Sequence, residues 1–295
     1  MGSYFSDFVA FCDSQYKRPE RCEGCAYECP GGCERCLSKI HWKNGTSRRY
    51  DCHNMAAYYV CKNIFKYSSE IEYLLRQARA ILELPELDML SIGCGPCSDL
   101  FGALSFLDHN EQSDKEMRYL GVDLNPIWLP IQDYIGRDIG DGKEGIITAF
   151  KQEEFSTLVE NLRFLGKPWT PNIVVLEYVF SDMFTFHYDI KGFVDRFAEF
   201  LFPLMPPKSF IMINDINHRD VRPYFSSLHS SLFKRSKQIH VSTWHFVNDF
   251  RWFYSYGTQH SQNYLTVTIP SDIRKRYNPW RSCSSAQMLI YKSDQ

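Results

Sequence analysis

The chain has 295 residues, of which 44% are hydrophobic and 23% charged, so it can form one large globular domain or one domain and a small module. Its formal net charge of -2 excludes a chain that binds nucleic acid over its whole surface. It contains no run of about 18 apolar residues and no recognisable signal peptide, so we expect a cytoplasmic protein without a membrane span.

Cysteines are concentrated at the start of the sequence. Eight of the 11 lie in the first 61 residues, at Cys12, Cys22, Cys25, Cys29, Cys33, Cys36, Cys52 and Cys61. A reducing compartment disfavours disulfides, and a Cys-x-x-Cys pair can place two thiolates on one tetrahedral zinc ion. His53 and His41 are further possible ligands. We therefore expect residues 1–62 to form a metal-binding module with structural zinc, whose ligands come from these cysteines and His53.

The cysteine spacing also fits two alternatives to zinc. Cys22, Cys25, Cys29 and Cys33 would suit an iron–sulfur cluster, since thiolates are the usual ligands of such clusters. Free cysteines buried in a core are the second alternative. Polar residues separate the cysteines of this segment, which argues against a purely apolar role.

A helix and a buried strand are expected next. The Ser-x-x-Glu pattern at residues 69–72 is a capping box, so a helix should begin there and continue to Pro85. The apolar run 87–92 is typical of a buried strand, and Gly93 and Gly95 then form a tight turn before the next helix. Such a strand–turn–helix unit lets the backbone approach a ligand and points helix N–H groups at it.

A second strand is expected over residues 118–122, and it ends at Asp123. A carboxylate at the tip of the second strand can accept hydrogen bonds from both hydroxyls of a ribose. The separation between Gly95 and Asp123 exceeds the usual ~20 residues, and the polar loop 109–116 accounts for the additional length.

These two motifs resemble those of the class I S-adenosylmethionine-dependent methyltransferases. Residues 91–97, Ser-Ile-Gly-Cys-Gly-Pro-Cys, are similar to the first motif of that family, and residues 121–125, Gly-Val-Asp-Leu-Asn, to its second. The resemblance implies that residues 63–295 form a Rossmann-like α/β domain, with a seven-stranded, mostly parallel sheet and helices on both faces. It implies cofactor contacts by Ser91, Gly93, Cys94, Gly95, Pro96, Asp123, Leu124, Asn125 and Glu177. The sequence departs from the family at Ser91, which is usually acidic, and at Cys97, which is usually glycine.

The later strands fit the same plan. Residues 172–177 are expected to form strand four, 209–216 strand five, and 239–244 and 286–291 the closing strands. In the family, the exit of strand four faces the methyl group. The resemblance therefore implies catalytic roles for Glu177, Tyr178 and Asp182.

Basic residues outnumber acidic ones after His218, with clusters at residues 234–237 and 274–276. Together with the cysteine-rich module, this surface favours a nucleic acid, RNA before DNA, as the substrate. The aromatic segment 244–256 could stack bases, although we expect most of its rings in the core.

The sequence thus favours a methyltransferase that acts on RNA with the help of the zinc module. One alternative is a protein that keeps the fold and the cofactor but does no chemistry, because Ser91 is not acidic and no catalytic motif is evident. Another alternative is a methyltransferase for a small molecule or a protein. No Asn-Pro-Pro-Tyr motif follows strand four, so methylation of exocyclic base amines is not supported.

Overall fold

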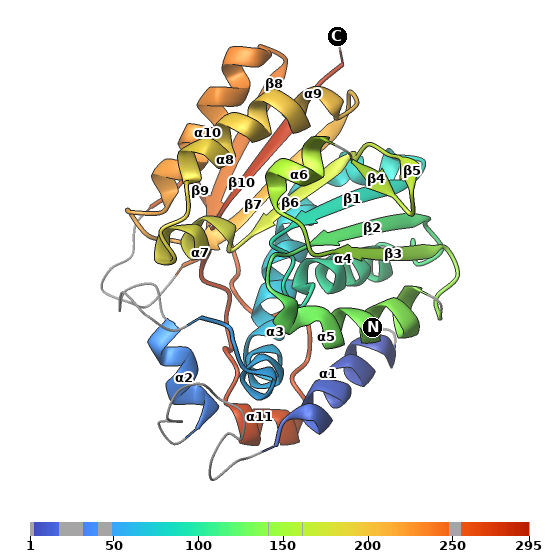
Figure 1. Cartoon of the computed structure of the whole chain (residues 1–295), viewed down its shortest axis with the longest axis vertical. Coiled ribbons are helices and arrows are strands. Elements are labelled where there is room, and N and C mark those ends of the chain that lie inside the picture. Colours follow the sequence, from blue (N-terminus) through green and yellow to red (C-terminus); the bar gives the residue numbers. More distant parts are fainter. Residues whose placement is uncertain are drawn as a thin grey trace.

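The computed structural model describes residues 3–17, 32–40, 49–140, 142–160, 162–247 and 255–294. An eight-stranded sheet in the order β3-β2-β1-β6-β7-β10-β8-β9 forms its centre (Figure 1). The strands are β1 Leu87–Ile92, β2 Met117–Val122, β3 Ile146–Lys151, β6 Ile173–Glu177, β7 Ser209–Ile216, β8 Ile239–His245, β9 Thr258–Gln259 and β10 Ser285–Lys292, and a separate hairpin contains β4 Arg163–Phe164 and β5 Lys167–Pro168.

All neighbouring strands of the sheet are parallel except those that flank β10, which is antiparallel to β7 and to β8. The chain proceeds outward from β1 through β2 to β3 and then returns to place β6 on the other side of β1. The strand order thus reverses at β1, and open α/β sheets bind their ligands at the carboxyl ends of the strands beside such a reversal. The expected Rossmann-like, mostly parallel sheet is confirmed, with the short β9 added at one edge.

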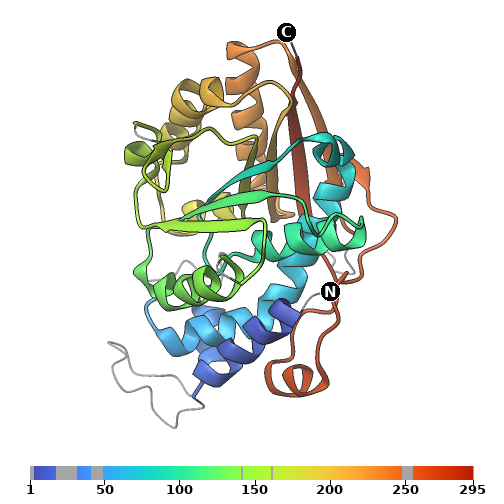
Figure 2. The ribbon, with the colours of Figure 1, turned by 90° about the vertical axis from the view of Figure 1, so that its right-hand side faces the viewer.

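Helices cover both faces of the sheet (Figures 1 and 2). They are α1 Ser3–Gln15, α2 Cys33–Ile40, α3 His53–Gln77, α4 Ser98–His109, α5 Leu129–Ile135, α6 Phe155–Glu160, α7 Val179–Thr185, α8 Ile190–Arg196, α9 Phe202–Leu204, α10 Arg222–Arg235 and α11 Ser271–Tyr277. Buried side chains of α1, α3, α4 and α5 form one core against β1 and β2. Those of α6, α8 and α10 form a second core on the opposite face. No helix among these described segments is long and apolar enough to cross a bilayer.

The long helix α3 begins earlier than the sequence predicts. It starts at His53, and the expected cap residue Ser69 lies within it, where its hydroxyl donates to the Phe65 carbonyl at 2.6 Å. Glu72 is buried and accepts a hydrogen bond from Ser105 of α4 at 2.7 Å. The prediction of a helix start at residue 69 was wrong. Ser69 also accepts the Thr266 N–H at 3.0 Å, so both polar side chains serve contacts between α3 and the body instead of a helix end. The expected boundary at residue 62 falls inside this helix.

The first helix packs into the same core as the sheet. Phe8 of α1 stacks on Phe101 of α4 with ring centroids 4.5 Å apart, and Phe5 meets Phe65 and Phe101 edge to face. Phe5 and Phe8 are buried, and Figure 2 shows α1 lying along α3. Helices α1 and α3 therefore bury their apolar faces against the α/β domain.

Candidate cofactor and acceptor site

The glycine-rich turn lies at the carboxyl end of β1. Gly93 and Gly95 have positive φ values of 67° and 48°, which glycine adopts without strain. The N–H groups of Gly93 and Cys94 donate to the Val122 carbonyl at 2.8 and 3.1 Å, so the turn is fixed to the end of β2. Cys97, in the place of a third glycine, also has a positive φ of 61° and directly precedes α4. The left-handed backbone at this third position is thus kept, although the residue is a cysteine.

Asp123 at the tip of β2 is fixed beside this turn. Its Oδ2 accepts the Gly95 N–H at 2.9 Å and its Oδ1 accepts the Asn125 N–H at 2.8 Å. Burial raises the pKa of Asp123, while these two hydrogen bonds lower it. Each carboxylate oxygen keeps a further lone pair that could accept a ribose hydroxyl. The neighbouring Leu124 is 49% exposed and presents an apolar surface next to the carboxylate.

Asp99 of α4 lies next to Ser91, the position of β1 at which the sequence has no acidic residue. Ser91 is buried, and its side chain hydrogen-bonds to Asp99 in the first turn of α4. Asp99 also accepts hydrogen bonds from the Tyr119 hydroxyl at 2.9 Å and the Leu100 N–H at 3.0 Å. Burial raises the pKa of Asp99 to about 6. Sequence reasoning missed Asp99, because only the packing of α4 on the sheet brings it to Ser91.

Glu177 ends β6 next to the start of α4. Its Oε2 accepts the Ser98 hydroxyl at 2.5 Å and its Oε1 accepts the Asn214 amide of β7 at 3.2 Å. Burial and the charge of Asp99 raise the pKa of Glu177 well above its usual range. The structure therefore brings together two of the sequence-predicted regions, the glycine-rich turn and the exit of strand four, at one end of the sheet.

Tyr178 is held by a buried carboxylate from α3. Its hydroxyl donates to Glu70 Oε2 at 2.7 Å, and the N–H groups of Ser284 and Ser285 donate to Oε1 at 2.7 and 3.1 Å. The Asn214 amide also reaches Glu70 Oε2 at 3.2 Å. Glu70 thus connects α3 to the tips of β6 and β7 and the start of β10. No local pattern indicates this role, since Glu70 is 108 residues from Tyr178.

Tyrosines from α3 and from the segment before it lie close to Asp182, the third predicted catalytic residue. The charge of Asp182 is one cause of the raised pKa of Tyr50, Tyr59 and Tyr67, after the larger effect of burial. The Asn125 amide donates to the Tyr50 carbonyl at 2.7 Å, which fixes this segment over the second motif. Tyr50 therefore lies next to the second motif, and Tyr67 lies 4.2 Å from the ring of Tyr178 at the exit of β6.

The predicted metal ligands are only partly described. Cys22, Cys25, Cys29 and His41 lie outside the described residues. Within the described ranges, no three His, Cys, Asp or Glu side chains gather into a group that could hold a metal. The remaining predicted ligands lie on α1, α2 and α3 or just before α3: Cys12, Cys33, Cys36, Cys52, His53 and Cys61.

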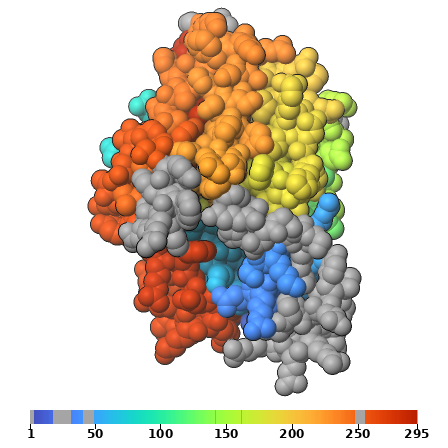
Figure 3. Space-filling view, turned by 90° about the vertical axis from the view of Figure 1, so that its left-hand side faces the viewer, coloured from blue at the N-terminus to red at the C-terminus, as the bar shows by residue number. Residues whose placement is uncertain are grey.

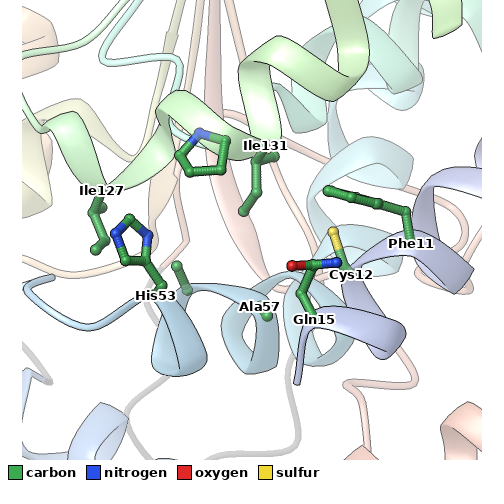
Figure 4. Close-up of a pocket in the computed structure, with 9 residues that line it drawn as sticks. Phe11, Cys12, Gln15, His53, Ala57, Ile127 and Ile131 are labelled. Atoms are coloured by element: carbon green, nitrogen blue, oxygen red, sulfur yellow. The ribbon is translucent and has the colours of Figure 1, made fainter. Parts of the chain in front are cut away.

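A small hollow of about 140 Å³ separates two of these predicted ligands (Figure 4). It lies between α1, α3 and α5, and its walls are mostly apolar side chains such as Phe11 and Ile131. Cys12 and His53 both line it, and Figure 4 shows them at opposite ends. Burial raises the pKa of Cys12 well above its usual range, so its thiol is neutral in this apolar setting.

No protein-family model matches the chain, and no curated protein is similar to it. Solved structures with a similar arrangement include methyltransferases with S-adenosylhomocysteine or S-adenosylmethionine bound. The plantazolicin methyltransferase in complex with S-adenosylhomocysteine is 12% identical, with a TM-score of 0.45 over 88% of this chain and 97% of its own. Magnesium protoporphyrin IX methyltransferase from Synechocystis PCC 6803 is 10% identical, with a TM-score of 0.42 over 77% of this chain and 80% of its own. Likenesses this distant say nothing about the substrate or the activity of this chain.

Proposed function

We propose that the protein is an S-adenosylmethionine-dependent methyltransferase. The observation that carries this proposal is the contact between Asp123 and the Gly95 N–H, at the carboxyl end of β1. A carboxylate next to a glycine-rich turn that opens a helix is an arrangement that would suit the ribose hydroxyls of a nucleoside-type cofactor. A cofactor with its ribose on Asp123 would extend along the turn toward Glu177.

Methyl transfer from a sulfonium is an in-line displacement, so the protein mainly has to align the acceptor with the methyl group. Such alignment can supply ~7–11 kcal/mol of the barrier reduction. Glu177 at the tip of β6, with Tyr178 and Asp182 just after it, are the polar side chains that would face the acceptor. A base is needed only if the acceptor must lose a proton, and a carboxyl group with a raised pKa suits that task.

The first prediction concerns cofactor binding. Replacing Asp123 with Ala removes both ribose acceptors, so we expect S-adenosylmethionine and S-adenosylhomocysteine to bind at least ~100-fold more weakly, as expected for two lost charge-assisted hydrogen bonds. Calorimetric titration of both ligands into the wild type and the variant measures this change. The matched control is Asp114→Ala, the same substitution on an exposed loop, which should leave binding unchanged.

Absence of binding to the folded wild type would refute the proposed function. Binding that Asp123→Ala leaves intact would place the cofactor elsewhere in the chain. A protein that binds the cofactor without catalysis, the second candidate from the sequence, would give the same titration and would transfer no methyl group to any acceptor.

A nucleic-acid acceptor, with RNA favoured, stays a prediction. The two basic clusters that motivated it lie at opposite ends of the molecule (Figures 1 and 3). Residues 234–237 join α10 to β8 at the upper end, whereas residues 274–276 belong to α11 at the lower end. In addition, Arg276 pairs with Asp13 of α1. The clusters therefore do not form one continuous basic surface among the described residues.

Zinc binding by the N-terminal cysteines also stays a prediction. Cys33 and Cys36 are buried and lie one turn apart on α2, so they could supply two thiolates to one ion. Asn54 of α3 donates to the Cys33 sulfur at 3.4 Å. The other ligands of a four-coordinate site would have to come from outside the described residues, where Cys22, Cys25 and Cys29 lie.

A further inference from the structure

Residues 94–97 of the glycine-rich turn have the sequence Cys-Gly-Pro-Cys and join β1 to α4. Two cysteines separated by two residues, between a strand and a helix, have the spacing of redox-active dithiols. We refer to Cys94 and Cys97 as the turn dithiol. Both thiols are free and buried, and neither belongs to the N-terminal cysteines that are the predicted metal ligands.

The backbone of the turn brings the two cysteines close together. The Cys97 N–H donates to the Cys94 carbonyl at 2.7 Å, which closes a β-turn over residues 94–97. The end residues of a β-turn have Cα atoms less than ~7 Å apart. A disulfide joins Cα atoms that are ~4.4–6.8 Å apart, so the turn holds its two cysteines at a separation that suits such a bond.

The sulfur atoms of the turn dithiol lie around one carbonyl group. The Cys97 thiol donates to the Gly95 carbonyl at 3.8 Å. The Gln132 amide donates to the same carbonyl at 3.0 Å and to the Cys94 sulfur at 3.4 Å. A hydrogen bond between the two thiols also contributes to the raised pKa of Cys94, after the larger effect of burial. The two side chains are therefore neighbours, as their backbone atoms are.

Cys97 is an unusual residue for its backbone conformation. Its φ of 61° lies in the left-handed region, which favours glycine, and the family with the similar motif usually has glycine at this place. Strained residues other than glycine persist mainly at functional sites. Any small side chain would carry the same backbone cost here, whereas only cysteine adds a second thiol beside Cys94.

We propose that the turn dithiol is an oxidative modification site, at which a peroxide links Cys94 and Cys97 in a reversible disulfide that weakens cofactor binding. The effect on cofactor binding rests on the proposed methyltransferase function. The formation of the disulfide does not rest on it, so the two can be measured separately.

The oxidation proceeds in two steps. The thiolate of Cys94 attacks one oxygen of hydrogen peroxide, the oxygen–oxygen bond breaks, and Cys94 becomes a sulfenic acid. The hydroxide that leaves takes up the proton that Cys94 released. The Cys97 thiol then attacks the sulfenic sulfur, the sulfur–oxygen bond breaks, and the leaving oxygen takes up the thiol proton to form water. Two thiols are thus oxidised to one disulfide, and one peroxide is reduced to two molecules of water.

The accessibility of the thiols sets the order of these steps. Cys94 is 6% exposed and Cys97 is 0% exposed, so a small oxidant reaches Cys94 first. Burial raises the pKa of Cys94 well above its usual range, and the thiolate is the nucleophile. Oxidation is therefore slow at neutral pH and should become faster as the pH rises toward about 9.

A disulfide would change the turn that the cofactor is proposed to contact. Its sulfur atoms are ~2.05 Å apart, so the Cys94 sulfur would have to move. In the reduced protein this sulfur accepts the Gln132 amide and packs over Gly121 of the second motif, where an added Cβ atom would lie 2.9 Å from it. Gly95 lies between the two bridged residues, and its N–H donates to Asp123. Tightening of the turn therefore disturbs the contact that carries the proposed cofactor site.

The first measurement identifies the disulfide in the full chain. The protein is reduced, treated with hydrogen peroxide, alkylated with iodoacetamide in denaturant and digested with trypsin. The tryptic peptide of residues 80–115 contains Cys94 and Cys97 and no other cysteine. After peroxide we expect this peptide to lack two hydrogens and to carry no alkyl group. When dithiothreitol is added before alkylation, it should carry two alkyl groups.

The second measurement is a calorimetric titration of S-adenosylhomocysteine into the reduced and the oxidised protein. We expect the oxidised protein to bind at least roughly tenfold more weakly, as for one lost hydrogen bond to a charged group, and dithiothreitol to restore the affinity. Cys97→Gly, which introduces the usual glycine, should bind like the reduced wild type and lose no affinity in peroxide. Cys283→Ser removes a buried cysteine outside the turn; this matched control should respond to peroxide as the wild type does.

Three results would overturn the inference. The first is a peptide that keeps two alkyl groups after peroxide, or gains oxygen instead of losing hydrogen. The second is a disulfide that leaves the affinity unchanged, and the third is an equal loss of affinity in Cys97→Gly and the wild type. If the reduced wild type does not bind S-adenosylhomocysteine, the proposed function is refuted, and with it the effect on cofactor binding. If the reduced protein binds it and peroxide has no effect, only this inference is refuted.

Discussion

At the scale of single residues, the buried carboxyl groups of the site make the free protein sensitive to pH. Burial raises the pKa of Asp182 to about 8 and that of Asp215 to about 6, and it also raises the pKa of Asp123. An Asp in an unfolded chain has a pKa near ~3.9. At a pH between the pKa of such a group in the unfolded chain and its raised pKa in the folded protein, the folded protein binds more protons. Its stability therefore decreases as the pH rises.

We therefore expect the melting temperature of the ligand-free protein to fall by a few degrees between a pH of about 5 and about 8. Asp182→Asn should remove part of this fall, most clearly above a pH of about 6, where Asp215 has already ionised. Tyr50, Tyr59 and Tyr67 stay neutral throughout this range, because burial raises their pKa further. If the melting temperature falls equally with pH in the wild type and in Asp182→Asn, the raised pKa assigned to Asp182 is contradicted.

At the scale of elements, the contact between α3 and α4 depends on one glycine. A Cβ atom at Gly102 of α4 would lie 2.6 Å from the Ser68 carbonyl and 2.9 Å from the Ile71 Cβ atom of α3. Both neighbours belong to a buried helix face, so neither can move away easily. Close packing here holds α3, and with it Tyr59, Tyr67 and Glu70, against the rest of the fold.

Gly102→Ala should therefore lower the free energy of unfolding by about 1–3 kcal/mol through overpacking. Urea unfolding of the wild type and the variant measures this difference. Gly136→Ala is the matched control, since its Cβ atom would meet only Phe150 and Thr148 at 3.9 and 4.0 Å, which is ordinary van der Waals contact. Equal stability of Gly102→Ala and the wild type would show that α3 is not packed as tightly as described.

At the scale of the whole molecule, α1 and α3 share a hydrophobic core with β1 and β2. The expected boundary at residue 62 would cut this core, because α3 crosses it. Elements that bury their apolar surface against one another unfold together in a small protein. The described part of the chain should consequently behave as one cooperative unit.

Phe8→Ala tests this cooperativity. The side chain is fully buried and stacks on Phe101, so its removal should cost about 3–5 kcal/mol. Differential scanning calorimetry should then show a single transition that moves as a whole to a lower temperature. A separate early transition, with the main one unchanged, would show instead that the N-terminal helices unfold as an independent module.

The central strands and the cofactor motifs could be predicted from local sequence. β1, β2, β6, β7 and β10 follow local apolar runs, β8 mixes apolar and polar residues, and the turn at Gly93 and Gly95 follows a local glycine pattern. Asp123 could be placed for the same reason, since a strand tip is defined by the strand before it. β3 was not predicted, and most of its side chains are only partly buried in the structure.

The folded structure was needed to identify the distant side chains that complete the site. Asp99 supplies the carboxylate next to Ser91, Glu70 holds Tyr178, and Tyr67 of α3 lies 4.2 Å from the ring of Tyr178, all through contacts that local sequence patterns do not specify. A local pattern gives the face that a helix buries, whereas its partners depend on how whole elements pack. For the same reason, two basic clusters from the same third of the sequence lie at opposite ends of the folded molecule.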